Sequence, residues 1–90
     1  MPALLVTYDL NSPGQKHAKV LKVIQSFKYY AKLSESSYAI DSSLTPQQIY
    51  TKFKPLLDSN DTLWVITLKH PYYGQGDQQV INWLDASLTR

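Results

Sequence analysis

The chain has 90 residues, a formal net charge of +2 and no cysteine. A length of 90 residues predicts a single domain, 1–90, with no room for a second core. The lack of cysteine excludes disulfides, thiol nucleophiles and cysteine-ligated metals, and it favours a reducing compartment or a stable oligomer. No segment has the pattern of a signal peptide or a membrane span, so we expect a cytoplasmic protein that does not associate with membranes.

The first third of the chain predicts a strand followed by a helix. Residues Ala3 to Tyr8 form a short apolar run that is apolar on both sides, which is typical of a central strand. A turn over 11–14 leads into a helix predicted from His17 to Phe27. One side of this helix is apolar, and the opposite side carries Lys16, Lys19 and Lys22.

The middle of the chain predicts a hairpin and a second helix. Two short segments, 29–33 and 37–40, are separated by three polar residues and are typical of paired strands. Thr45 and Gln48 have the spacing of a capping box, with Pro46 at the first helical position. Pro55 falls inside the helix that follows and is expected to kink or shorten its last turn.

The last third predicts a strand over 62–69 and a helix over 78–88. The resulting order indicates an α+β, ferredoxin-like βαββαβ fold with a four-stranded antiparallel sheet, two helices on one face and an extra C-terminal helix. The other face then needs a cover, and the C-terminal helix and a partner subunit are the candidates. We expect both Phe53 and Trp64 to be buried.

Three segments together resemble a known family. They are 5–10 (Leu-Val-Thr-Tyr-Asp-Leu), 35–40 (Glu-Ser-Ser-Tyr-Ala-Ile) and 60–66 (Asn-Asp-Thr-Leu-Trp-Val-Ile), with a basic helix after the first. This ordered set resembles the CRISPR-associated Cas-two superfamily, which includes the VapD-type toxin ribonucleases, and within it the SinR-like small proteins. The resemblance covers nearly the whole chain, from Ala3 to Leu88.

The resemblance implies a homodimer in which one Asp at the end of the first strand of each protomer binds Mg²⁺ and supports phosphodiester cleavage. Asp9 occupies that position and is therefore the candidate catalytic and metal-binding residue. The chain differs from active members in two respects. It has Lys16, His17 and Lys19 where they often carry an Arg, and its tail is helical where many end in a strand that pairs with the partner.

The residues themselves leave alternatives open. Asp9 is also compatible with a turn role, in which its carboxylate accepts backbone N–H groups. Asn11 and Ser12 are placed to contact phosphate, but turn and capping roles explain them as well. The three lysines of the first helix form either a solvated face or a nucleic-acid-binding face.

Three functional hypotheses follow. The first is an Mg²⁺-dependent endonuclease dimer that acts on RNA through Asp9. The second is a non-catalytic dimer that binds RNA or DNA through the basic helix. The third is an interaction protein, such as an antitoxin or a component of a defence or counter-defence system, that binds a protein partner.

Overall fold

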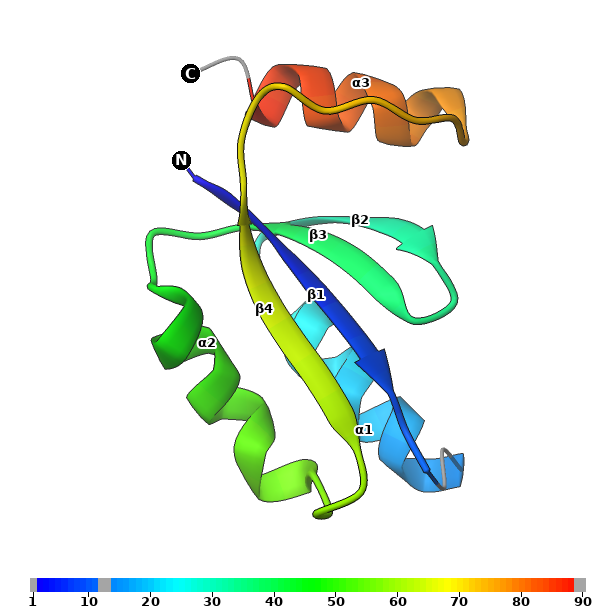
Figure 1. Ribbon diagram of the computed structural model, residues 1–90, viewed down its shortest axis with the longest axis vertical. Helices are drawn as coiled ribbons and strands as arrows, with labels where there is room; N and C mark the ends of the chain where they lie inside the picture. Colours follow the sequence, from blue (N-terminus) through cyan, green and yellow to red (C-terminus); the bar gives the residue numbers. More distant parts are fainter. Residues whose placement is uncertain (1, 12–13, 89–90) are drawn as a thin grey trace.

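The structure is a computed structural model that describes residues 2–11 and 14–88. Within these residues, the chain forms four strands, three α-helices and one short 3₁₀ helix (Figure 1). They are β1 (Ala3–Asp9), α1 (Gly14–Gln25), β2 (Tyr29–Ser34), β3 (Ser37–Asp41), α2 (Pro46–Phe53), the 3₁₀ helix η1 (Lys54–Leu56), β4 (Thr62–Leu68) and α3 (Gln78–Ser87). In the part of the chain that is described, no helix is long and apolar enough to cross a membrane.

The strands form one antiparallel sheet in the order β2-β3-β1-β4. β1 is central, and its Leu5 lies opposite Ala39 of β3 and Ile66 of β4. This small α+β architecture confirms the predicted four-stranded antiparallel sheet with an extra C-terminal helix, and it is consistent with a ferredoxin-like fold.

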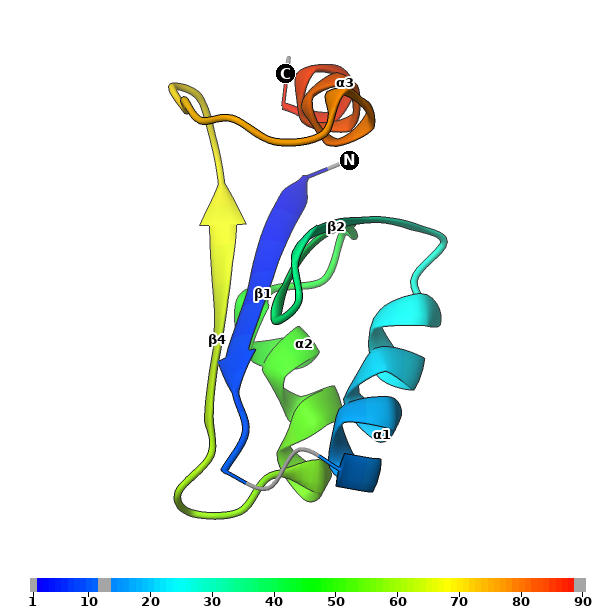
Figure 2. The same cartoon turned by 90° about the vertical axis from the view of Figure 1, so that its right-hand side faces the viewer.

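One face of the sheet is covered by α1 and α2 (Figure 2). β1 directs Leu4, Val6 and Tyr8 to this face, because side chains alternate along a strand. Among the described residues, the almost fully buried members of the core are Leu4, Val6, Tyr8, Val20, Ile24, Tyr38, Ile40, Ile49 and Phe53. The prediction that Phe53 is buried is therefore confirmed.

Local sequence signals set both ends of α2. The Thr45 hydroxyl accepts the N–H of Gln48 at 3.1 Å, and the Gln48 side chain accepts the N–H of Thr45 at 2.9 Å. The predicted capping box is thus confirmed. The α-helix ends at Phe53 and the chain continues as η1 through Pro55, which is the predicted shortening of the last turn.

The opposite face of the sheet, here called the open face, is covered only at one end. α3 and the segment that leads to it lie over the end of the sheet where β1 begins and β4 ends (Figures 1 and 2). The prediction that Trp64 is buried is wrong, since its side chain is 63% exposed. Trp64 lies opposite Thr7 in the register of β1 and β4, so it points to the open face, away from α1 and α2.

Candidate functional site

Asp9 is the last residue of β1 and lies on the open face. It alternates with the core residue Tyr8, is exposed, and lies opposite Thr62 of β4. Within residues 2–11 and 14–88, no hydrogen bond or ion pair reaches its carboxylate. The carboxylate is therefore accessible to a ligand, and the turn hydrogen bonds of the alternative interpretation are not formed in this part of the chain.

The chain after Asp9 is held by a carboxylate from the turn before β4. The backbone N–H of Asn11 donates to Oδ1 of Asp61 at 2.8 Å. Asn11 is exposed, which leaves its side chain open to solvent near Asp9. Ser12, the other predicted phosphate contact, lies outside the described residues.

Lys16 is tied to the same turn. Its Nζ lies 2.6 Å from a carboxylate oxygen of Asp58 and 2.6 Å from one of Asp61. The Lys16 side chain is only 16% exposed, and that of Asp61 is fully buried. Hydrogen bonds to Asp58 and Asp61 raise the pKa of Lys16. The charge of Lys16 is thus compensated inside the molecule, whereas Lys19 and Lys22 are exposed.

Asp61 gives the stability of the fold a pH dependence at the acid end. Hydrogen bonds from Lys16 and from the N–H groups of Asp58 and Asn11 lower the pKa of Asp61 from 3.8 to about 2. A carboxyl group with a lowered pKa stabilises the fold above its unfolded pKa, and this contribution is lost as the pH falls from about 4 to about 2. We therefore expect the urea concentration at the midpoint of unfolding to decrease as the pH is lowered from about 4 to about 2.

In the Asp61→Asn variant this acid-side fall is expected to be smaller, because the titrating group is gone. Tryptophan fluorescence during urea titration from pH 2 to pH 7 measures both midpoints. An equally steep loss of stability in the two proteins would contradict the assignment.

Tyr8 and His17 belong to the covered side of the sheet. The Tyr8 hydroxyl lies 3.0 Å from Nε2 of His17 and also donates to the carbonyl of Glu35 at 3.4 Å. Burial raises the pKa of Tyr8 to about 12, with smaller effects of Tyr38 and Glu35. His17 is half-buried, as expected for a residue at the border of the apolar stripe of α1. These two rings link β1 to α1 and face away from Asp9.

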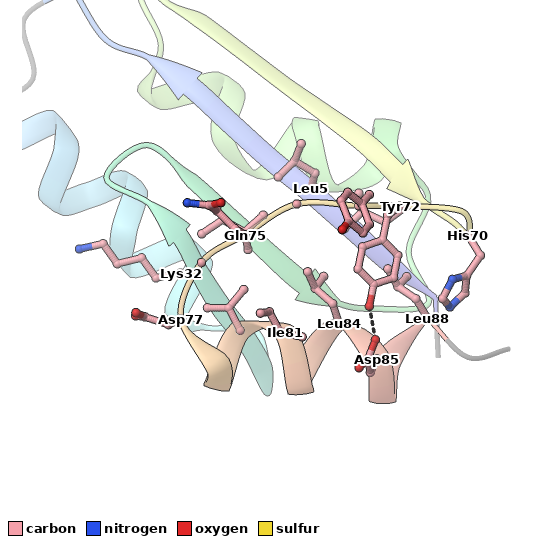
Figure 3. Close-up of a pocket in the computed structure, with 16 residues that line it drawn as sticks. Leu5, Lys32, His70, Tyr72, Gln75, Asp77, Ile81, Leu84, Asp85 and Leu88 are labelled. Atoms are coloured by element: carbon pink, nitrogen blue, oxygen red, sulfur yellow. Dashed lines mark hydrogen bonds between the residues drawn. The ribbon is translucent and has the colours of Figure 1, made fainter.

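A separate hollow lies at the other end of the open face. A cleft of about 740 Å³ separates α3 and the segment before it from the sheet (Figure 3). Leu5, Leu33 and Leu68 line it from the sheet, and Ile81 and Leu84 line it from α3. Leu5 is four residues from Asp9, about 13 Å along the strand, so this cleft is distinct from the Asp9 site.

Polar residues also line the cleft. Figure 3 shows Lys32 and Asp77 at one end and His70 at the other. The Tyr72 hydroxyl donates to the carboxylate of Asp85 on α3, and this bond raises the pKa of Tyr72. The sequence predicted α3 but not this cleft, because the amphipathic pattern of a helix does not indicate how closely the helix approaches the sheet.

In the described residues, no three His, Cys, Asp or Glu side chains come together in a group that could hold a metal ion. Mg²⁺ usually binds through one or two carboxylates and keeps several waters, so an exposed carboxylate such as that of Asp9 is compatible with such an ion. In the ladder of β1 and β4, the residue opposite Asp9 is Thr62, which is not a carboxylate.

Comparison with known proteins gives no family assignment: no protein-family model matches the chain, and no curated protein matches it.

Proposed function

We propose that the chain is a ferredoxin-like protein that forms a homodimer through its open face, and that this dimer is an Mg²⁺-dependent endoribonuclease of the Cas-two/VapD type. Asp9 of each protomer would hold the metal. The single observation that carries the proposal is the placement of an exposed carboxylate, without a partner in the described residues, on the same face as the exposed apolar side chains of β4.

The open face has the composition of an interface. Trp64 is 63% exposed and Ile66 is 49% exposed, and they lie opposite Thr7 and Leu5 of the central strand. Contiguous exposed apolar surface on a small protein marks a contact with another molecule. Trp is enriched in the buried centres of protein interfaces. A second copy that packs on this face covers both side chains.

A two-fold axis near the exposed end of β1 would bring the two Asp9 carboxylates together. Two carboxylates, solvent waters and a phosphate oxygen make up the ligand set that Mg²⁺ prefers. A bound Mg²⁺ would supply charge stabilisation at the scissile phosphate and lower the pKa of an attacking water. The chain's own contribution is to hold Asp9 at the end of a strand that is paired on both sides.

Exposed lysines on α1 fit an RNA substrate. Lys19 and Lys22 are exposed on this helix, and Lys28 lies beyond it with its Nζ 5.5 Å from the ring centroid of Tyr29. Such cations lower the free energy of binding to a phosphate backbone and make it dependent on salt. Because Lys16 is paired with two carboxylates, we assign phosphate contact to Lys19 and Lys22 and a structural role to Lys16.

The test is a cleavage assay with the purified wild-type protein. We expect it to cut single-stranded RNA in the presence of MgCl₂, to lose this activity in EDTA and to recover it when Mg²⁺ is restored. A matched DNA strand determines whether the activity is specific for RNA. RNA and DNA that both stay intact over a range of pH and Mg²⁺ concentration would overturn the enzymatic proposal.

The exposed aromatic side chains favour a second candidate, a non-catalytic dimer. Tyr29 is 54% exposed and Tyr73 is fully exposed, and exposed rings stack on unpaired bases or pack against a protein partner. Binding of RNA or DNA without cleavage, weakened steeply by salt, would support the nucleic-acid-binding form. Absence of such binding would leave a protein-interaction dimer, such as an antitoxin or a defence component.

Dimerisation is tested by the substitution Trp64→Ser. A large ring at the centre of an interface contributes about 2 kcal/mol or more, which corresponds to an increase of about 30-fold in the dissociation constant of the dimer. Sedimentation over a range of concentrations measures this constant. Tyr50→Ser is the matched control, because Tyr50 is exposed on α2, on the covered side of the sheet. Equal dissociation constants for the two variants would place the interface elsewhere.

A further inference from the structure

We propose that Asp61 is a positioning residue for Asp9: its buried carboxylate fixes the chain immediately after the strand that carries Asp9. The claim that Asp61 affects Mg²⁺ binding and RNA cleavage rests on the proposed function. The claim that Asp61 restrains the chain after Asp9 rests on the geometry of the described residues.

The Asp61 carboxylate joins three segments. Its Oδ1 accepts the N–H of Asn11 at 2.8 Å, and its Oδ2 accepts the N–H of Asp58 at 2.8 Å and Nζ of Lys16 at 2.6 Å. The side chain is fully buried. A buried carboxylate is stable only when its oxygens have such partners, so the three segments are held in one arrangement.

This arrangement holds Asp9 from both directions. The residue that follows Asp61 is Thr62, which lies opposite Asp9 in the ladder of β1 and β4. The residue held by Oδ1 is Asn11, two positions beyond Asp9. Only Leu10 lies between the end of the strand and the Asn11 hydrogen bond. The last residue of a strand is prone to fraying, and this bond restricts the segment where fraying would begin.

A comparison of Asp58 and Asp61 distinguishes the positioning role of Asp61 from its ion pair with Lys16. Asp58 is 70% exposed, and its carboxylate contacts Lys16 but not Asn11. Removing the Asp58 carboxylate takes away one ion pair and leaves the Asp61–Asn11 bond in place. Removing the Asp61 carboxylate takes away the Asn11 bond, while Lys16 keeps Asp58 as a partner. Asp58→Ala is therefore the matched control for Asp61→Ala.

The first measurement is amide hydrogen exchange in the full-length chain, followed by NMR. We expect the Asn11 amide to exchange at least about 10-fold faster in Asp61→Ala than in wild type, after normalisation to the core amides of Val6 and Ile40, and to be unchanged in Asp58→Ala. Asp61→Asn serves as a second variant if Asp61→Ala does not fold. The N–H groups of Asn11 and Asp58 donate to different oxygens of Asp61, and Asn replaces one of these oxygens by an NH₂ donor, so one of the two bonds is lost. An Asn11 amide that is unaffected, or that accelerates only in proportion to the core amides, overturns the inference.

The second measurement follows Mg²⁺ through the backbone amide of Asp9 and through RNA cleavage. Loss of a residue that orients a metal ligand typically weakens metal affinity or activity by 10–100-fold. We expect the Mg²⁺ concentration at half-saturation to rise by about 10-fold in Asp61→Ala and to stay unchanged in Asp58→Ala. If the wild-type protein binds Mg²⁺ and the half-saturating Mg²⁺ concentration of Asp61→Ala is unchanged, the positioning role is overturned. Wild-type protein that neither binds Mg²⁺ nor cleaves RNA overturns the proposed function. The hydrogen-exchange result then still tests whether Asp61 restrains the chain after Asp9.

Discussion

If the proposed function holds, Asp9→Asn is expected to reduce Mg²⁺-dependent RNA cleavage by about 100-fold or more while the protein stays folded. Asn matches Asp in size but lacks the negative charge that attracts Mg²⁺. A metal ion contributes several kcal/mol of transition-state stabilisation, and each 1.36 kcal/mol corresponds to a factor of ten in rate. The side chain is exposed and has no partner in the described residues, so its replacement removes no internal contact there. The measurement is the cleavage rate at a Mg²⁺ concentration that saturates the wild type.

Asp77→Asn is the matched control for this prediction. Asp77 is exposed, it occupies the N-cap position of α3 without a side-chain capping bond, and it lines the cleft near the other end of the sheet. The same loss of charge there is expected to leave cleavage unchanged. Asp9→Asn protein with wild-type activity would exclude Asp9 as the metal ligand. If Asp9 has only a turn role, the substitution changes stability by about 1 kcal/mol or less and affects no activity.

The features that were predicted well from the sequence depend on residues that are close together in the chain. The capping box needs only Thr45 and Gln48, which are three positions apart, and Pro55 ends α2 through its own missing N–H. The alternation of β1 likewise identifies Leu4 and Val6 as one face of the strand. The start of α1 was less well predicted: the helix begins at Gly14, about one turn before His17.

The exposure of Trp64 shows that the alternation of side chains along a strand does not determine which face of the sheet is covered. Both faces of β4 carry large apolar side chains, so the pattern gives the two faces but does not indicate which one the helices cover. Coverage depends on how α1 and α2 cross the sheet, which is set by contacts between distant segments. In the structure they cover the face of Leu63 and Val65, and Trp64 and Ile66 remain on the open face.

The cluster around Asp61 was missed for a similar reason. Lys16 is 42 residues from Asp58 and 45 from Asp61, and only the folded sheet brings the two ends together. In the sequence, Lys16 is one of three lysines on a polar face, and Asp61 is one residue of a polar turn. The distance of three positions between Asp58 and Asp61 allows both to meet one cation, but this spacing is too common to predict a contact. The position of Asp9 at the end of β1 was therefore predictable, whereas the contacts that hold the chain next to it were not.

Phe53→Ala is expected to destabilise the protein by about 3–5 kcal/mol. Phe53 is fully buried at the end of α2, where its ring packs with the core residues of β1 and α1, and truncation leaves a cavity that surrounding side chains fill only in part. This loss is a large fraction of the stability of a small domain, so the thermal midpoint should fall by about 12 °C or more. Urea unfolding at one fixed protein concentration measures the change, because the proposed dimerisation would make the stability depend on concentration. Lys52→Ala, an exposed substitution on the same helix, is the control and should change stability by about 0.5 kcal/mol or less. A Phe53→Ala protein within about 1 kcal/mol of the wild type would show that α2 does not anchor the covered face of the sheet.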